Sequence, residues 1–517
     1  MITNKTTNRI WAALTALLLA VAPATASHPH RGIGCWRGTP RRTAPMTMAR
    51  MLSRQFQGDA PSSPYIGQKR GLVILAEFPE TTFKSGHDAD KYLKILNEPG
   101  YTTSEGFRGS AADYFRDQSG GQFELNFDVV GPYKAAHQEA YYGVNDDLGL
   151  DLRPELLIKE MCEAADSEVD FSNYDWDGDG EVDEVFVVYA GKSEINNYDR
   201  DADKLIWPHM WSMEESTTGV FELDGMRINI YACSNELKST GAIDGIGTFC
   251  HEFSHCLGLP DLYDTIDSGE EGMSNFDIMD QGCYSGRSFC PVGYSAYEKM
   301  ACGWQMPIVL GNEDVTVDSI QPISLGGDTY IIYNDAQPDE YYMIENRKRY
   351  GWDTNYPVTG LLITHIDYDK EVWENNLVNS VISLEDALEM EYTCGNDHSR
   401  VTFFNASNNK RAPQLYPFSM RDSLTATSKP AATLWNTNSQ GTKLMLGAIV
   451  DIKQHNDGTM AFTYRAPATA TAITTVSATD KRHQRPTYYT TDGRAAGTDW
   501  QSLRHGVYIV NGRKVVR

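Results

Sequence analysis

Short apolar runs and amphipathic repeats alternate along the first three hundred residues of the chain. The spacing of apolar positions predicts β-strands over 71–78, 122–130 and 185–190. Helical periodicity predicts helices over 111–116, 155–165, 245–257 and 294–302. Because these strands and helices follow no strict strand–helix–strand rhythm, the pattern predicts an α+β domain over residues 65–304.

The pattern changes after Trp304, where the apolar runs become strand-like. These runs cover 328–334, 341–346, 360–367, 448–452 and 460–464. They predict a β-rich, sandwich-like domain over 305–465. The stretch 466–486 is rich in alanine and threonine and then basic, which is the composition of a linker. The last segment, 487–517, ends in a predicted β-hairpin that turns at Asn511 and Gly512.

Residues 1–26 have the pattern of a secretory signal peptide. Lys5 and Arg9 precede an apolar run that is too short to cross a bilayer comfortably. Small residues follow this run and predict cleavage before Ser27, and an uncleaved anchor is the alternative. Residues 27–64 are rich in arginine and weakly patterned, and we interpret them as a leader or pro-segment.

Composition narrows the possible functional classes. The 517 residues include 45 basic and 70 acidic side chains, and this net charge of −25 argues against a nucleic-acid-binding protein. A hydrophobic content of 41% is enough for a sizeable core, and no transmembrane segment is expected once the signal is removed. Export would place the nine cysteines in an oxidising space, where Cys283 and Cys290 could bridge a local loop.

The predicted helix over 245–257 carries a candidate metal site. His251 and His255 are four residues apart, so they project from one face with the spacing that one metal ion requires. Glu252 lies about 100° further round the axis, where it can reach a metal-bound water without being a ligand. The helix would stop at the following glycine, and the chain could then turn to bring Asp261 to the metal.

These residues predict a zinc hydrolase site. His251, His255 and Asp261 would leave a fourth zinc position open for water. Zinc would lower the pKa of that water, and Glu252 would take its proton as general base. The apolar residues of the same helix form a separate core stripe: Ile246, Phe249, Cys250, Phe253 and Leu257. A chance match, or a descendant that keeps the helix without catalysis, is the alternative.

Longer blocks around this motif resemble the immune inhibitor A family of secreted metallopeptidases. The string HEFSHCLGLPDLYD, from His251 to Asp264, is similar to the active site of that family. Further similar blocks lie at 110–123, 207–211, 294–304, 345–347 and 360–362. The resemblance covers residues 65–465 and implies a zincin-type fold, zinc endopeptidase activity and Asp261 as the third ligand. Asp264 also lies just beyond the turn and is the alternative ligand.

The family is similar to the metzincins, which place a methionine turn beneath the metal. Met279 is the corresponding candidate here and would form a hydrophobic floor, not a ligand. An ordinary core methionine is the alternative. Some metzincins have a tyrosine two residues further on, but this sequence has Gln281 there, and Tyr284 is a weak substitute.

An acidic segment resembles the start of an EF-hand calcium loop, with alternating carboxylates and a glycine at the sharp turn. The candidate ligands are Asp175, Asp177, Asp179, Glu181 and Asp183. The twelfth position is Phe186 where an EF-hand has glutamate, so the last ligand would come from Asp183, Glu184 or elsewhere. The family resemblance also implies calcium here, and a solvated acidic turn is the alternative.

Two further features bear on latency and export. Cys35 in the leader could ligate the zinc as a thiolate until the leader is removed, although an unrelated or disulfide-bonded cysteine is the alternative. The tail over 487–517 resembles a type IX secretion sorting signal, which implies secretion machinery as a partner. A small packed accessory domain is the alternative for this tail.

Taken together, these patterns predict a zinc-dependent endopeptidase, secreted or at the cell surface, that hydrolyses extracellular proteins or peptides. Zinc is the expected catalytic cofactor, and calcium is expected as a second ion. A catalytically inactive surface module that binds proteins and keeps the zincin scaffold is the second hypothesis. A zinc hydrolase of a non-peptide bond is the third.

Overall fold

The computed structural model describes residues 65–467 except 147, 148, 196 and 391, together with four short strands near the C-terminus. The chain divides into two compact units, Met1–Pro467 and Ala468–Arg517. The predicted signal peptide, the leader and Cys35 lie outside the described residues, as does the predicted linker beyond residue 467. Their roles stay predictions.

A five-stranded sheet lies at the centre of the first half of the chain. Its strands, in spatial order, are β2 (Phe123–Lys134), β1 (Gly67–Glu77), β3 (Val185–Lys192), β7 (Ile230–Leu237) and β4 (His209–Ser212). The first four are parallel, and β4 runs antiparallel to β7 at one edge. The three predicted strands of this half are confirmed as β1, β2 and β3. The apolar pattern missed β7 because its last four residues include the buried polar residues Ser234, Asn235 and Glu236.

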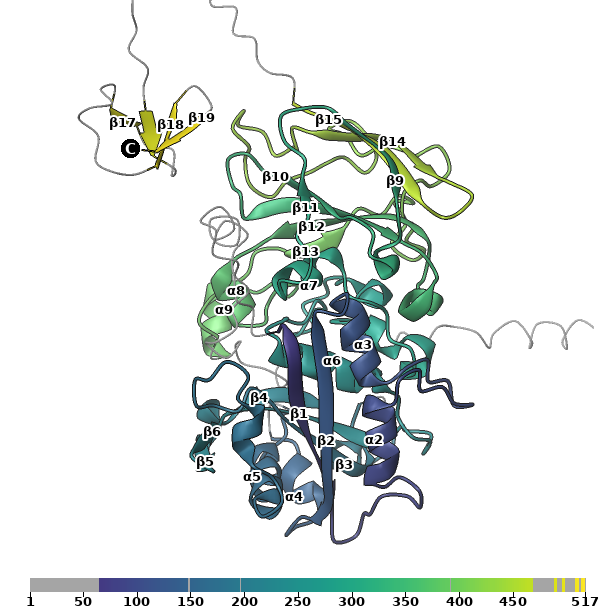
Figure 1. Cartoon of the computed structure of the whole chain (residues 1–517), viewed down its shortest axis with the longest axis vertical. Helices are drawn as coiled ribbons and strands as arrows, with labels where there is room; N and C mark the ends of the chain where they lie inside the picture. The colour runs from purple at the N-terminus through teal and green to yellow at the C-terminus, as the bar shows by residue number, and fades with distance from the viewer. Residues whose placement is uncertain are drawn as a thin grey trace, which may run out of the picture. The chain divides into compact units, whose positions relative to one another are not determined.

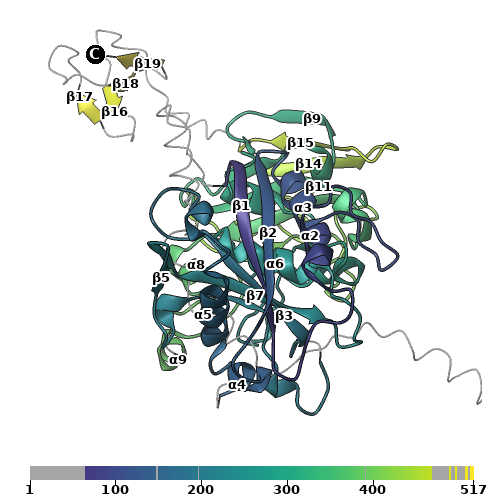
Figure 2. The ribbon, with the colours of Figure 1, turned by 60° about the horizontal axis from the view of Figure 1, so that its bottom comes forward.

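Helices cover both faces of this sheet (Figure 1). Alternate residues of β1 enter two separate cores, with Val73 and Leu75 in one and Leu72 and Ile74 in the other. The first core is covered by α2 (Ala89–Asn97), α3 (Ala111–Gln118) and α6 (Ile246–Cys256). The second is covered by α4 (Glu139–Gly143) and α5 (Pro154–Ala165). Two views show α2 and α3 beside β2 (Figure 1, Figure 2).

Local sequence signals set where several of these helices begin. The Ser110 hydroxyl oxygen accepts a hydrogen bond from the Asp113 N–H at 3.1 Å, and Asp113 Oδ2 accepts one from the Ser110 N–H at 3.0 Å. This reciprocal capping box starts α3. Ser295 and Glu298 make the same arrangement at the start of α7 (Ala296–Ala301). All four predicted helices are confirmed, as α3, α5, α6 and α7, whereas α2 and α4 were not predicted.

Two further sheets follow residue 304. One has the order β13-β12-β11-β10-β8, and the other has the order β14-β15-β9. Their strands are β8 (Ile308–Val309), β9 (Val315–Ile320), β10 (Tyr330–Tyr333), β11 (Glu340–Arg347), β12 (Gly360–Asp367), β13 (Val401–Phe403), β14 (Ala448–Gln454) and β15 (Met460–Arg465). Tyr342 and Ile344 of β11 pack in a core with residues of the second sheet.

The opposite face of β11 belongs to the core of the first half. Tyr341 and Met343 lie in the same hydrophobic cluster as residues of α3 and α6. One core therefore continues across the predicted domain boundary at 304/305, and that boundary stays a prediction. The mixed α+β class is confirmed, while the zincin arrangement stays a prediction.

Short elements complete the described chain. They are β5 (Phe221–Leu223), β6 (Met226–Ile228), α8 (Lys370–Glu374) and α9 (Leu384–Glu389). In the second unit, β18 (Val507–Val510) pairs antiparallel with β19 (Arg513–Val516), as the predicted hairpin requires. These two strands share a sheet with β16 (Tyr488–Thr490) and β17 (Ala495–Gly497). None of the helices in the described residues is long and apolar enough to span a membrane.

A buried arginine joins β11 to the segments around it. Arg347 is fully buried, and its Nη1 donates to the Gly293 carbonyl oxygen at 2.9 Å and to Asp353 Oδ2 at 3.1 Å. Its Nε donates to Glu345 Oε1 at 2.5 Å. The two carboxylates are also buried, so each depends on the guanidinium for compensation of its charge.

Arg347→Met is expected to lower the free energy of unfolding by roughly 3–5 kcal/mol, because two buried carboxylates lose their counter-charge. Chemical denaturation of the full chain measures this loss. Arg465→Met is the control, since Arg465 forms an exposed ion pair with Asp314 and its removal should change stability little. Similar losses for the two variants would contradict the role of Arg347.

Candidate metal centre and active site

Helix α6 holds the two histidines of the motif. It runs over Ile246–Cys256, and Gly258 beyond its end has a φ of 84°, as predicted for a glycine that stops the helix. The apolar spacing predicted one core face, but every residue of α6 is buried. The reason is that the chain returns over the histidine face, where the carbonyl oxygens of Leu259 and Ile278 contact the imidazoles.

The beginning of α6 packs tightly against the 3-10 helix η5 (Gln281–Ser288). A Cβ atom on Gly247 would lie 1.9 Å from the carbonyl oxygen of Cys283. Only glycine permits this approach. The close packing holds the first turn of α6 against the segment that follows Met279.

Three side chains converge beside α6. The Nε2 atom of His251 lies 3.2 Å from Asp261 Oδ1, and the Nε2 atom of His255 lies 3.3 Å from the same oxygen. One ligand atom from each of His251, Glu252 and His255 lies within 4.8 Å of the others. The structure therefore brings together all four residues predicted for the zinc site.

Hydrogen bonds on the far side of each imidazole set its orientation. His251 Nδ1 lies 2.8 Å from the Ile278 carbonyl oxygen, and His255 Nδ1 lies 2.7 Å from the Leu259 carbonyl oxygen. A carbonyl oxygen only accepts, so each Nδ1 donates its proton and each Nε2 is the ring nitrogen that faces Asp261. This is the arrangement in which histidine binds a metal.

The point where these atoms meet favours a positive charge. Asp261 Oδ1 is buried and receives no other hydrogen bond from the described residues. Burial disfavours a charged His251, but its contact with Asp261 and the charges of Glu252 and Asp261 raise the pKa of His251 to about 9. Burial also opposes ionisation of Asp261, yet the histidines lower its pKa below the ordinary range. Two imidazoles and a carboxylate are a donor set that suits zinc.

Glu252 lies at the same centre but in a different setting. It is 6% exposed, and burial raises the pKa of its carboxyl group. The neighbouring histidines and a hydrogen bond from the Met210 main chain oppose this rise. Met210 belongs to β4, the edge strand of the central sheet. A buried carboxylate with a raised pKa, beside a metal position, is suited to proton transfer.

The segment around Met279 contacts the elements that carry the candidate metal ligands. Met279 is fully buried, and its carbonyl oxygen accepts a hydrogen bond from the Leu262 N–H at 2.7 Å, next to Asp261. The preceding residue, Ile278, provides the carbonyl group that binds His251. The turn therefore contacts both a histidine and the loop of the third predicted ligand. Gln281 is exposed and Tyr284 is half-buried.

Asp264, the alternative ligand, is used elsewhere. Its Oδ2 accepts hydrogen bonds from the N–H groups of Gly269 and Glu270, at 2.8 and 3.2 Å. Its Oδ1 accepts one from the Ile266 N–H at 3.3 Å. These bonds close the loop that follows the metal-binding turn, so the geometry favours Asp261 as the ligand.

The acidic segment forms a second candidate metal site. One oxygen each from Asp175, Asp177 and Asp183 lies within 4.8 Å of the others. Glu181 is directed elsewhere, with Oε1 accepting from Asn229 Nδ2 at 3.3 Å and Oε2 3.4 Å from Arg227 Nη1. Asp179 is outside this group of three, and its Oδ1 accepts from the Glu181 N–H at 3.0 Å. The structure gathers three of the five predicted calcium ligands.

Glu184, another candidate for the last calcium ligand, points into the protein interior. It is 1% exposed, and neither carboxylate oxygen has a hydrogen-bond partner among the described residues. Burial raises the pKa of Glu184 well above its usual value. A protonated carboxyl group is the form that such an apolar position favours.

Sequence reasoning missed one residue of the metal centre. Asn376 Nδ2 donates to Asp261 Oδ2 at 2.7 Å, although the two residues are 115 positions apart. No local pattern marks such a contact.

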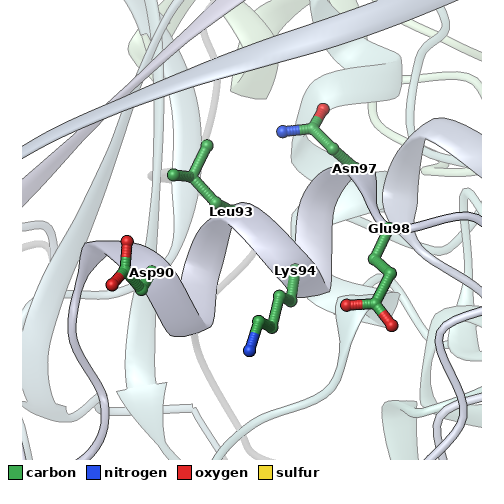
Figure 3. A pocket seen from close by; sticks show the side chains of 5 residues that line it. All are labelled: Asp90, Leu93, Lys94, Asn97 and Glu98. Atoms are coloured by element: carbon green, nitrogen blue, oxygen red, sulfur yellow. The ribbon is translucent and has the colours of Figure 1, made fainter.

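A separate shallow hollow beside α2 is lined by Asp90, Leu93, Lys94, Asn97 and Glu98 (Figure 3). None of these five residues belongs to either candidate metal site.

Comparison with known proteins places the catalytic part of the chain. Residues 73–306 match the family described as immune inhibitor A peptidase M6, catalytic domain. These residues are similar to the catalytic domain of that family of peptidases, and we call them the M6 domain. The resemblance predicted from the sequence blocks is confirmed for this M6 domain, and the candidate metal centre lies within it. The predicted sorting signal at the C-terminus is not part of the match.

Two curated relatives agree with this assignment. Immune inhibitor A of Bacillus thuringiensis subsp. alesti is 26% identical over 327 residues, which cover 52% of this chain and 45% of the relative. Pre-pro-metalloprotease PrtV of Vibrio cholerae serotype O1 (strain M66-2) is 25% identical over 277 residues, which cover 45% of this chain and 30% of the relative. The chain therefore spans less than half the length of either relative.

The packing of the M6 domain at Gly247 can be tested. Gly247→Ala is expected to lower the free energy of unfolding by about 1–3 kcal/mol, because the added methyl group meets a main-chain oxygen. Thermal or urea unfolding measures the change. Gly311→Ala, where a Cβ meets nothing within 4 Å, is the matched control and should leave stability nearly unchanged. An unchanged Gly247→Ala variant would contradict the close packing of α6 on η5.

Proposed function

We propose that the chain is a zinc-dependent endopeptidase, with His251, His255 and Asp261 as the metal ligands and Glu252 as the general base. The observation that supports this most directly is the meeting of two imidazole Nε2 atoms and one carboxylate oxygen beside a buried glutamate. The family assignment of residues 73–306 supports a peptidase activity.

Each residue would have a distinct part in the reaction. Bound zinc would polarise the substrate carbonyl group and lower the pKa of a coordinated water. Glu252 would accept the proton of the attacking water and pass it to the leaving amine. Its raised pKa suits this exchange, since a carboxyl group with a pKa nearer to neutrality both takes up and releases a proton readily.

Strand β4 is suited to holding the substrate. It is the edge strand of the central sheet, and Met210 within it contacts Glu252. An edge strand has main-chain groups that can pair with an extended peptide. A substrate bound in this way would place a peptide bond beside the general base, so protein or peptide substrates are proposed.

Export is a proposal that rests on the sequence alone. The signal-like pattern over 1–26 and the sorting-like tail over 487–517 support secretion or a location at the cell surface, with the secretion machinery as a partner. Cys35 would maintain latency if its thiolate occupied the fourth zinc position.

The activity is tested by incubating the purified, metal-replete chain with casein. Glu252→Gln is expected to lower kcat/KM by roughly 100-fold to 10,000-fold, because the amide cannot accept the proton. The zinc content of this variant should stay at the wild-type level, since Glu252 is not among the proposed ligands. Treatment with 1,10-phenanthroline should abolish cleavage by the wild-type chain.

Glu222→Gln provides the control, because it makes the same substitution at an exposed position of β5. Its cleavage rate should match that of the wild type. A wild-type chain that binds zinc but cleaves neither casein nor a broad peptide library would favour the inactive protein-binding module. Full activity in Glu252→Gln would exclude the proposed base.

We further propose that Asp175, Asp177 and Asp183 bind calcium. Carboxylate oxygens are the ligands that calcium prefers, and the three groups repel one another unless a cation lies between them. The Asp175 oxygens also accept the Gly178 and Gly180 N–H groups at 2.7 and 2.9 Å, which holds the loop in a binding shape.

Calcium at 100 times its dissociation constant should stabilise the wild-type chain by about 2.7 kcal/mol and raise its melting temperature by a few degrees. Asp183→Asn should lose most of this response, as it removes one of the three charges. Asp179→Asn is the control and should keep the response, because asparagine retains the oxygen that accepts the Glu181 N–H. Differential scanning fluorimetry distinguishes these results, and an equal response in both variants would exclude the site.

A further inference from the structure

Asn376 forms a two-point contact with Asp261. The Asn376 Oδ1 atom accepts a hydrogen bond from the Asp261 N–H at 2.8 Å. The Asn376 Nδ2 atom donates to Asp261 Oδ2 at 2.7 Å. Both residues are buried, with exposed fractions of 2% and 1%. One amide side chain therefore binds both the main chain and the carboxylate of the same residue.

This contact determines which carboxylate oxygen faces the histidines. Because Oδ2 of Asp261 accepts from Asn376, Oδ1 is left to face the Nε2 atoms of His251 and His255, at 3.2 and 3.3 Å. Rotation of the carboxylate would break the bond from Asn376 and leave a buried donor without a partner, which is costly. Asn376 thus fixes the orientation of the proposed third ligand.

Asn376 is itself held in place. Its φ of 51° lies in the left-handed region, which asparagine tolerates better than most residues. Its N–H donates to the Trp373 carbonyl oxygen at 3.1 Å, and its own carbonyl oxygen accepts from Thr265 Oγ1 at 3.0 Å. Trp373, in α8, donates through its indole N–H to Tyr297 Oη at 2.6 Å. Asn376, whose two-point contact with Asp261 we call the clamp, is therefore anchored to α7 as well as to the segment 259–265, which we call the metal loop.

Residues 376–380, which we name the strap, contact the metal loop at further points. Asn379 Nδ2 donates to the Leu262 carbonyl oxygen at 2.8 Å. Ser380 Oγ accepts from the Thr265 N–H at 2.8 Å. The strap lies 70 residues or more beyond residue 306, where the match to the family's catalytic domain ends. It is therefore supplied by the part of the chain predicted as an accessory domain.

We infer that Asn376 is a positioning residue of the metal centre, and that the metal affinity of the M6 domain depends on this strap. The inference rests on the proposed zinc function and adds to it a residue from outside the matched domain. Residues that orient a ligand typically change metal affinity by roughly 10- to 100-fold when they are removed.

The test measures the zinc dissociation constant of the full chain by competition with a chromogenic chelator. Asn376→Gly removes the side chain and suits the left-handed backbone, so it separates the clamp from backbone strain. It is expected to weaken zinc binding by roughly 10- to 100-fold. Thr265→Val removes the hydroxyl that donates to the Asn376 carbonyl oxygen and also contacts Ser380 Oγ, and it should weaken binding less, in the same direction. If Asn376→Gly does not fold, the zinc affinity of Thr265→Val provides the test.

Asn375→Ala is the matched control, because it removes a neighbouring buried amide that contacts the Glu371 carbonyl oxygen and Thr393, and neither Asp261 nor Thr265. It should lower the stability of the zinc-free chain while leaving the zinc dissociation constant within twofold of the wild type. Loss of zinc affinity in Asn375→Ala equal to that in Asn376→Gly would show a general structural role and overturn the positioning role.

Asp261→Asn separates the inference from the function on which it rests. If Asp261 is the ligand, this variant binds zinc much more weakly, and adding Asn376→Gly to it causes little further loss. Wild-type affinity in Asn376→Gly, with weak binding in Asp261→Asn, would overturn the clamp and leave the proposed function standing. Wild-type affinity in Asp261→Asn would overturn both.

Discussion

The meeting of three buried polar atoms sets the central constraint on this fold. The Nε2 atoms of His251 and His255 lie 3.2 and 3.3 Å from Asp261 Oδ1. Buried polar atoms this close together are unfavourable unless a proton or a cation lies between them, so the surrounding structure must hold them in place. Much of the architecture between α6 and the later sheets serves this requirement.

Main-chain groups provide most of that support. The Ile278 and Leu259 carbonyl oxygens orient the imidazoles, and the Met279 carbonyl oxygen binds the loop of the carboxylate. Main-chain atoms depend little on side-chain identity, so these contacts tolerate substitution while the path of the chain is kept. The path itself depends on a core that runs from the parallel sheet to β11, with the buried Arg347 network beside it.

Local patterns predicted the parts of this arrangement that are local in sequence. The motif on α6, the stop at Gly258 and the return to Asp261 span eleven residues, and helical geometry with a helix-ending glycine relates them. Asn376 could not be predicted, because its contact with Asp261 joins distant segments through tertiary packing. The acidic loop shows the same limit: alternation predicted five ligands, but Asp179 and Glu181 make other contacts that no spacing rule reveals.

The buried cysteine thiols can report local unfolding of the regions that surround them. Burial raises the pKa of each of these cysteines, so the reactive thiolate is scarce while the fold is closed: Cys162, Cys233, Cys250, Cys256, Cys283, Cys290 and Cys394. Cys283 and Cys290 have no disulfide between them. Because these residues are spread over both cores and the region near α9, the order in which they react with an alkylating reagent would rank the regions by how often each one unfolds.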